Sequence, residues 1–282
     1  MDSESSFFIR HEFLIRRLHS LSGLAPVGAF LCVHLLTNAS VVGGSEIFQQ
    51  NVDRIHALGP LLPVVEWTFI FLPIIFHAVV GVIIVRSGSP NSGSYRYVSN
   101  FRYTMQRATA WIALVFIFWH VFHMHGWIHA QWWVDGVAEP LWGKQFDPGR
   151  ATTTAAIALG PLLVKVLYAI GVAATVFHFA NGIWTMGITW GAWTTPAAQH
   201  RANIVCAVFG VALFGVGMAG LYGMSAVDLE AARVNETVRL RLEEESQRTR
   251  KRLQEELQTK QQSAAAGVVI PPGDAIAPPR AD

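Results

Sequence analysis

Four histidines lie deep inside apolar stretches of the sequence, one in each of the first four stretches. They occur in LCVHLL, IIFHAV, FWHVF and VFHFAN, as His34, His77, His120 and His178. An ionisable side chain is costly in so apolar a setting, so a functional role is the first hypothesis. Neutral imidazoles on facing helices suit a b-type haem, whose iron needs two axial ligands. A hydrogen bond across a helix interface is the alternative for any single histidine.

Other metal chemistry fits the sequence less well. No carboxylate or thiolate accompanies the four histidines at the spacing typical of a zinc site. Both cysteines, Cys32 and Cys206, lie in apolar runs and cannot supply a disulfide framework or a four-thiolate cluster.

The composition points to a membrane protein. Of 282 residues, 52% are hydrophobic and 14% are charged, whereas about a quarter are charged in a soluble domain. The net charge of +2 and the scattered arginines give no basic stripe, which excludes nucleic-acid binding. The N-terminal 20 residues lack the apolar core and cleavage site of a signal peptide, so we expect them to be retained.

Five apolar stretches are long enough to cross a bilayer, which takes about 20 residues. They cover residues 22–40, 61–85, 107–127, 162–188 and 202–224. The predicted fold class is all-α transmembrane, with a five-helix bundle in residues 1–225 that binds two b haems. Residues 226–262 are rich in charge pairs three and four apart and predict a charged, solvated helix. Residues 263–282 are expected to form a disordered tail.

Basic residues in the short links predict the orientation in the cell inner membrane. Basic residues are concentrated in the N-terminus and the second link, whereas the first link holds only Arg54. The concentrated residues are Arg10, Arg16, Arg17, Arg86, Arg96, Arg102 and Arg107. The N-terminus is therefore expected to be cytoplasmic, and five crossings place the C-terminus outside.

This topology divides the four histidines into two pairs by depth. His34 and His120 fall in the outer halves of stretches that run outward, and His77 and His178 fall nearer the cytoplasm. Two haems at these two depths would allow electron transfer across the bilayer. Small residues on the same stretches would let a flat macrocycle approach the backbone, although close helix packing explains them equally well. These are Gly28, Gly81, Gly171 and Gly182.

A second histidine cluster follows His120 in the segment HVFHMHGWIH, as His123, His125 and His129. By periodicity His123 could replace His120 as a ligand, but apolar residues flank His120 more evenly. The cluster also suits an interfacial patch in an aromatic belt, or a metal or proton-relay site.

Polar residues at the stretch ends are further candidates. Arg16, Arg17 and Arg107 suit haem propionates, because guanidinium groups pair with carboxylates; surface anchoring is the alternative. His19 suits a propionate or a quinone oxygen, and it would serve equally as a surface anchor.

Four runs, in order, resemble the cytochrome b558 membrane anchor of succinate:quinone oxidoreductases. They are RRLHSLSGLAPVGAFLCVHLLTN, EWTFIFLPIIFHAVVGV, QRATAWIALVFIFWHVF and VFHFANGIWTMGITWG, within a resemblance from Phe8 to about Tyr222. The resemblance implies that His77 and His178 hold the haem nearer the cytoplasm and that His34 and His120 hold the outer one. Depth alone suggests the same pairs.

The resemblance also implies partners and a task. The chain would anchor a flavoprotein subunit, which carries FAD and oxidises succinate, and an iron-sulfur subunit on the cytoplasmic face. It would pass electrons through two b haems to a quinone, expected to be menaquinone, near the outer haem. The chain itself has no dinucleotide-binding glycine fingerprint and no cysteine set for clusters. Succinate oxidation by this chain alone is therefore not expected.

Two positions bear on proton transfer. Some similar di-haem fumarate reductases carry a glutamate two residues before the fourth-stretch histidine, where this chain has Val176. That difference favours electrons crossing outward, with the membrane potential driving quinone reduction. Glu66 matches the succinate-oxidising members, and an interface carboxylate facing Arg54 is the alternative to quinone-linked proton chemistry.

Two other functions compete with this one. An anchor of a hydrogenase or formate dehydrogenase would also bind haem, but the order and wording of the four runs argue against it. A proton-coupled transporter would use histidines as relay groups. The sequence shows no convincing internal repeat beyond the 43-residue spacing of His34, His77 and His120.

Overall fold

The computed structural model describes residues 2–86 and 98–265. The chain divides into two units, Met1–Arg233 and Val234–Asp282. Residues 266–282 of the expected tail, and Arg96 in the second link, lie outside the described residues. No strand occurs among the residues that the structure describes, and all their regular elements are helical.

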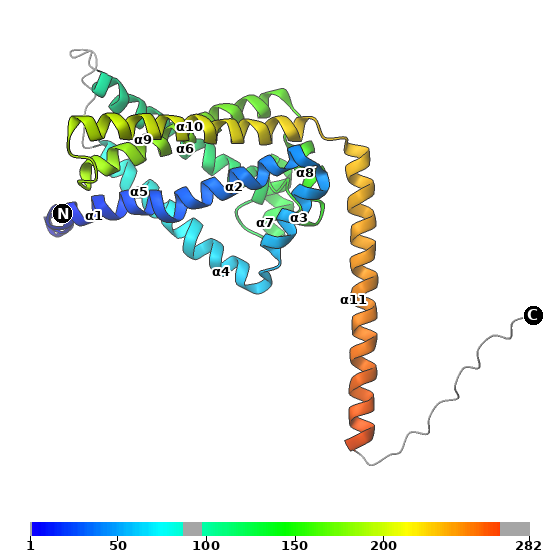
Figure 1. Cartoon of the computed structure of the whole chain (residues 1–282). Coiled ribbons are helices and arrows are strands. Elements are labelled where there is room, and N and C mark those ends of the chain that lie inside the picture. Colours follow the sequence, from blue (N-terminus) through cyan, green and yellow to red (C-terminus); the bar gives the residue numbers. More distant parts are fainter. Residues whose placement is uncertain (1, 87–97, 266–282) are drawn as a thin grey trace, which may run out of the picture. The chain divides into compact units, whose positions relative to one another are not determined.

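Five helical segments in the described ranges are long and apolar enough to cross a membrane (Figure 1). They are Arg10–Gly43, Gly59–Arg86, Asn100–His125, Leu162–Thr189 and Pro196–Ser225. The all-α transmembrane prediction is confirmed, and the chain is a multi-pass membrane protein. The first, third and fifth helices begin before the expected apolar boundaries, because polar residues continue a helix beyond the hydrocarbon core.

The first two segments are built from several elements each. The first joins α1 (Asp2–Ser22), η1 (Gly23–Gly28), α2 (Ala29–Ala39) and η2 (Ser40–Gly43). The second joins η3 (Gly59–Leu61), α4 (Leu62–Glu66), η4 (Trp67–Phe71) and α5 (Leu72–Arg86). Both η1 and η4 are π-helical turns; Pro26 lies inside η1 and Pro73 follows η4. Proline lacks the N–H that an α-helix needs, and a wider turn accommodates the missing bond without ending the helix.

The other three segments are single helices with recognisable ends. They are α6 (Val98–His125), α9 (Leu162–Thr189) and α10 (Pro196–Ser225). The Thr195 hydroxyl accepts a hydrogen bond from the Ala198 N–H at 3.2 Å, and Pro196 fills the first helical position. Gly126 follows α6 with φ of 80° and Gly191 follows α9 with φ of 76°, a conformation that favours glycine.

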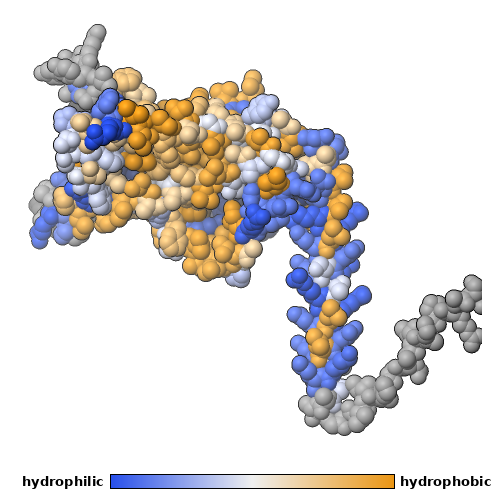
Figure 2. All heavy atoms as spheres, viewed as in Figure 1, coloured by the Kyte–Doolittle hydropathy of each residue, from blue (hydrophilic) through white to orange (hydrophobic). Residues whose placement is uncertain are grey.

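Within the first unit, α9 packs between α6 and α10, α10 packs on α2, and α1 packs on α5. Gly220 allows a close approach of α10 to α2, because a Cβ there would lie 3.2 Å from the backbone of Asn38 and Ala39. Large apolar side chains such as Val115, Leu163 and Val211 remain exposed on the bundle. Figure 2 shows such hydrophobic residues across the visible face of these helices, which is the surface that lipid chains would cover.

One end of the bundle carries short helices, α3 (Ser45–His56), α7 (Gln131–Trp133) and α8 (Ala151–Ala158), as Figure 1 shows. Three further turns join them to the bundle: η5 (Val134–Ala138), η6 (Glu139–Leu141) and η7 (Pro148–Arg150). We call α3, η7 and α8 the cap. Phe48 and Val52 of α3 and Ala155 of α8 form one buried cluster with Tyr168 of α9.

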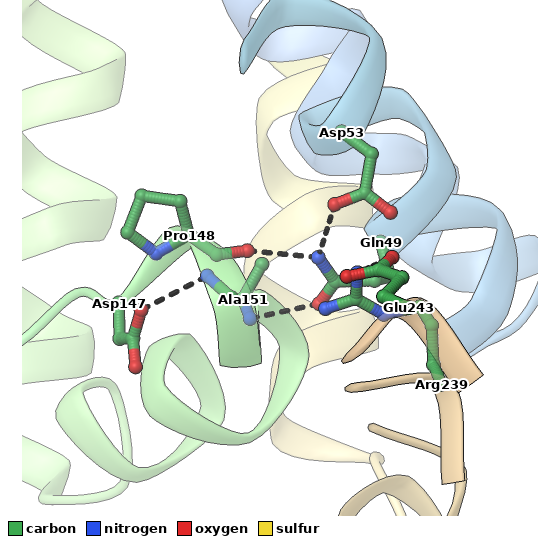
Figure 3. Close-up of polar contacts among 8 residues, drawn as sticks. Gln49, Asp53, Asp147, Pro148, Ala151, Arg239 and Glu243 are labelled. Carbon is green, nitrogen blue, oxygen red and sulfur yellow. Dashed lines mark hydrogen bonds and ion pairs between the residues drawn. The ribbon is translucent and has the colours of Figure 1, made fainter. Parts of the chain in front are cut away.

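The Gln49 side chain links α3 to η7 and α8 within the cap (Figure 3). Its side-chain Nε2 donates to Asp53 Oδ1 and to the Pro148 carbonyl, each at 2.8 Å, and its Oε1 accepts from the Ala151 N–H at 2.9 Å. Gln49 is only 3% exposed. One buried amide therefore satisfies backbone groups of both η7 and α8 from α3.

The second unit is the greater part of α11 (Leu229–Ala265). Charge pairs line its surface at helical spacing, including Arg239 with Glu243 at 2.7 Å and Arg248 with Glu244 at 3.9 Å. Exposed pairs of this kind contribute little to stability, about 0.3–0.5 kcal/mol each. The structure thus has one long charged helix where the sequence predicts a solvated one.

Candidate functional site

The four apolar histidines come together as two pairs of rings. His34 of α2 and His120 of α6 have ring centroids 5.8 Å apart at an interplanar angle of 73°. His77 of α5 and His178 of α9 have ring centroids 6.1 Å apart at 85°. We call the first the cap-side pair, because its helices end near the cap, and the second the far pair.

The spacing within each pair fits a shared iron. A metal–imidazole bond of about 2 Å puts the ring centroid roughly 3 Å from the metal. Two imidazoles on opposite faces of one iron would therefore have centroids about 6 Å apart. Among the described residues, no group of three or more His, Cys, Asp or Glu side chains could hold a metal ion. A haem needs only two such ligands.

In the far pair, backbone carbonyls orient both rings. His77 Nδ1 lies 2.9 Å from the carbonyl oxygen of His19, and His178 Nδ1 lies 3.1 Å from that of Gln106. A neutral imidazole carries one ring proton, so each Nδ1–H donates and each Nε2 keeps a lone pair for a metal. Such bonds to the second nitrogen usually fix metal-ligating histidines.

His19 itself packs against the far pair. Its ring stacks on His77 with centroids 4.1 Å apart and an angle of 11°. Gly23 makes room here, because a Cβ at this position would lie 2.4 Å from Cε1 of His77. His19 thus contacts a candidate ligand directly, which its expected position at the surface did not indicate.

A chain of amides runs from His178 to Arg102. Arg102 donates to Asn181 Oδ1 at 2.6 and 2.9 Å and to Asn203 Oδ1 at 2.6 Å. Asn181 Nδ2 donates to Gln106 Oε1 at 2.7 Å, and Gln106 Nε2 donates to the His178 carbonyl at 3.1 Å. Because arginine can only donate, it fixes the direction of every amide in the chain.

Side chains contact both rings of the cap-side pair. His120 Nδ1 lies 3.1 Å from the hydroxyl of Tyr168, and Phe116 stacks on the His120 ring at 5.7 Å and 24°. The Asn38 amide lies 3.3 Å from His34 Nε2 and donates to the His34 carbonyl at 2.8 Å. The ring contact is the longer one, so the carbonyl chiefly holds the amide.

A glycine on α9 makes room for the Phe116 ring that stacks on His120. A Cβ at Gly171 of α9 would lie 2.2 Å from the Phe116 ring, well inside van der Waals contact. Phe116 therefore occupies space that a larger residue on α9 would take, and it stays flat against His120. In the same way, a Cβ at Gly28 would lie 2.2 Å from the ring of Phe179.

The histidines that follow His120 separate into two places. His123 Nδ1 lies 2.9 Å from the Tyr168 hydroxyl, on the inside of the bundle. His125 and His129 pack together instead, with ring centroids 4.2 Å apart and with Phe71 beside His125. It is His120, and not His123, that makes the ring contact with His34.

A curated relative decides the family. The "Succinate dehydrogenase cytochrome b558 subunit" of Bacillus subtilis (strain 168) is 36% identical over 212 residues, which are 75% of this chain and 96% of the relative. The chain belongs to the succinate dehydrogenase cytochrome b558 subunit family. No protein-family model matches it. The family resemblance expected from the four sequence runs is confirmed.

The arginine candidates of this cytochrome b558-family chain lie at the far end of the bundle from the cap. Arg16 pairs with Glu12 at 2.7 Å. The Arg17 guanidinium lies over the rings of Phe13 and Trp190. Arg107 donates to the Tyr103 hydroxyl and to the Val85 carbonyl.

The two positions linked to proton transfer have different surroundings. Val176 is 3% exposed and packs in an apolar cluster with Leu35 and Leu213. Glu66 ends α4 and is half-buried. Arg54 donates to Asn51 Oδ1 at 3.0 Å, and within the described ranges no ion pair joins it to Glu66.

Sequence reasoning missed Tyr168, Gln106, Asn181 and Arg102 as neighbours of the histidines. Arg102 was used only to predict the orientation, and Tyr168 was not singled out. The sequence signal that could have found them is a polar side chain in an apolar helix, within a few turns of His120 on α6 or of His178 on α9.

Proposed function

We propose that the chain is the membrane anchor and electron-transfer subunit of a succinate:menaquinone oxidoreductase. The observation that carries the proposal is the two imidazole pairs at two positions along one bundle, with centroids 5.8 and 6.1 Å apart. The Bacillus subtilis relative supports the assignment, because its name makes it a cytochrome subunit of succinate dehydrogenase.

In this proposal the far pair, His77 and His178, holds the inner b haem, and the cap-side pair, His34 and His120, holds the outer one. When bound, the two haems supply one-electron carriers between the two faces of the membrane. The chain's own residues orient the rings. Backbone carbonyls keep the far-pair Nδ1 protons in place, and the Tyr168 hydroxyl does so for His120.

The partners follow from the same family. We infer a flavoprotein subunit with FAD and an iron-sulfur subunit on the cytoplasmic face, near the N-terminus. Menaquinone would react near the outer haem, on the side of the cap. Because Val176 is an apolar core residue, no carboxylate stands at that position in α9. The proposal therefore has electrons moving outward without a compensating proton route there.

A reduced-minus-oxidised absorbance spectrum of the purified chain tests the proposal. Two b-type haems per chain are expected. His178→Leu should retain one haem and weaken docking of the soluble subunits, because α9 would lose its metal link to α5. His200→Leu is the matched control, since His200 is exposed on α10 and outside both pairs. A chain that binds no haem, or a His178→Leu chain that keeps both, would overturn the assignment.

A further inference from the structure

The Tyr168 hydroxyl lies between two imidazoles of α6. It is 3.1 Å from His120 Nδ1 and 2.9 Å from His123 Nδ1. A phenol has one hydrogen to donate and lone pairs to accept with. Tyr168 can therefore donate to one of the two rings and accept from the other.

Counting protons fixes the direction of both bonds, given the proposed function, on which this inference rests. If His120 binds iron through Nε2, its single ring proton sits on Nδ1 and is donated to the Tyr168 oxygen. The hydrogen of Tyr168 is then donated to His123 Nδ1. His123 accepts, so it carries its own proton on Nε2.

Two of the three side chains, His123 and Tyr168, are buried and closely packed, and His120 is partly buried. His123 is 2% exposed and Tyr168 is 6% exposed. Trp119 stacks on the His123 ring at 4.9 Å and 9°, and Phe116 meets the edge of Tyr168 at 5.4 Å. Hydrogen bonds polarise one another more strongly in such surroundings than in water. A Tyr168 hydroxyl that donates to His123 is thereby a better acceptor for His120.

We propose that Tyr168, held by His123, is a positioning residue that sets the potential of the outer haem. A hydrogen bond from Nδ1–H to the phenol oxygen increases the electron density on His120 Nε2, which makes the ring a stronger donor. A stronger donor stabilises ferric iron more than ferrous iron and lowers the midpoint potential.

The two pairs differ in the groups that accept hydrogen bonds from their ring Nδ1–H. Both far-pair rings donate to backbone carbonyls, of His19 and Gln106, which no side-chain substitution removes. The His120 ring depends on one hydroxyl. Removal of that hydroxyl should change the outer haem alone.

The test is a redox titration of the complete complex in membranes, followed by haem absorbance, for the unaltered chain and for Tyr168→Phe. The component that disappears in His77→Leu identifies the inner haem. Tyr168→Phe should raise the midpoint potential of the outer haem and leave that of the inner haem unchanged. His123→Leu should shift it in the same direction by less, and His123→Gln, whose amide oxygen can accept, should restore it. Tyr222→Phe is the control, because Tyr222 is 73% exposed on α10.

An unshifted outer potential in Tyr168→Phe would overturn this inference while two haems per chain still support the proposed function. If Tyr168→Phe fails to retain the outer haem, His123→Leu supplies the measurement, and an unchanged potential there would overturn the inference as well. A complex without haem would instead overturn the proposed function.

Discussion

Gln106 and His178 exchange two hydrogen bonds across the contact between α6 and α9. The His178 ring donates to the Gln106 carbonyl, and the Gln106 side chain donates to the His178 carbonyl, both at 3.1 Å. Farther along the same contact, Tyr168 of α9 bonds to His120 of α6. Each helix thus orients a candidate ligand on the other, which makes this one contact the frame for both pairs.

The first prediction concerns Arg102, where the amide chain begins. Arg102→Gln removes the charge-assisted bonds to Asn181 and Asn203 and the stacking on Trp184, whose ring centroid is 3.9 Å away. Hydrogen bonds to charged groups contribute about 1.5–3 kcal/mol each in other proteins. We expect the free energy of unfolding to fall by about 2 kcal/mol and the inner haem to be lost first on heating. Thermal loss of haem absorbance in detergent measures both.

Arg201→Gln is the control for that change, because Arg201 is exposed near the start of α10. Arg102→Lys should fall between the two, since an ammonium group cannot reproduce the forked geometry of a guanidinium group. Equal melting of the Arg102→Gln and Arg201→Gln chains would show that the amide chain does not support His178.

The second prediction uses two glycines. Gly171→Leu should displace Phe116 from the His120 ring, because even a Cβ would lie 2.2 Å from it. The outer haem should then be lost or bound weakly while the inner haem stays. Gly215→Leu on α10 is the matched change, since nothing lies within 4 Å of a Cβ there. Haem content per chain, measured after purification, distinguishes the two, and equal content in both would contradict the proposed approach of α9 to α6.

The sequence was sufficient for features that depend on local composition. Runs of apolar residues predicted the membrane helices, and the depth of His34, His77, His120 and His178 in those runs predicted which rings would meet. The structure brings those rings together, and their ligand role stays a prediction. Helix starts were less accessible, because polar residues continue the helices beyond the apolar runs, and the π-helical turns at Pro26 and before Pro73 were not predicted.

The neighbours of the histidines could not be predicted from the sequence. Whether Tyr168 meets His120 depends on how α9 is rotated about its axis relative to α6, which an almost uniformly apolar helix does not encode. His123 and His125 are two residues apart and point to different places for the same reason, since such positions face apart on a helix. Gln49 joins residues about a hundred positions away, and no local pattern marks that contact.

The third prediction tests the cap. Gln49→Ala removes the two hydrogen bonds that join α3 to η7 and α8, together with a third bond to Asp53 within α3. Because the Ala151 N–H would be left buried without its partner, we expect a loss of about 1–3 kcal/mol in local stability. Hydrogen exchange of α3 and α8 should accelerate while α10 is unchanged. Gln50→Ala is the control, because the neighbouring Gln50 is exposed; the same acceleration in both chains would rule out a clamp at Gln49.

The fourth prediction concerns orientation. The basic residues of the N-terminus and the second link predict that the cap lies outside the cytoplasm. Glu46→Cys on α3 should therefore react with a membrane-impermeant thiol reagent in intact cells, whereas Thr194→Cys, in the exposed turn between α9 and α10, should react only after the membrane is opened. The unsubstituted chain gives the background, because Cys32 and Cys206 lie within membrane segments. The opposite labelling pattern would reverse the orientation and would place the cap-side pair, not the far pair, nearest the electron donor.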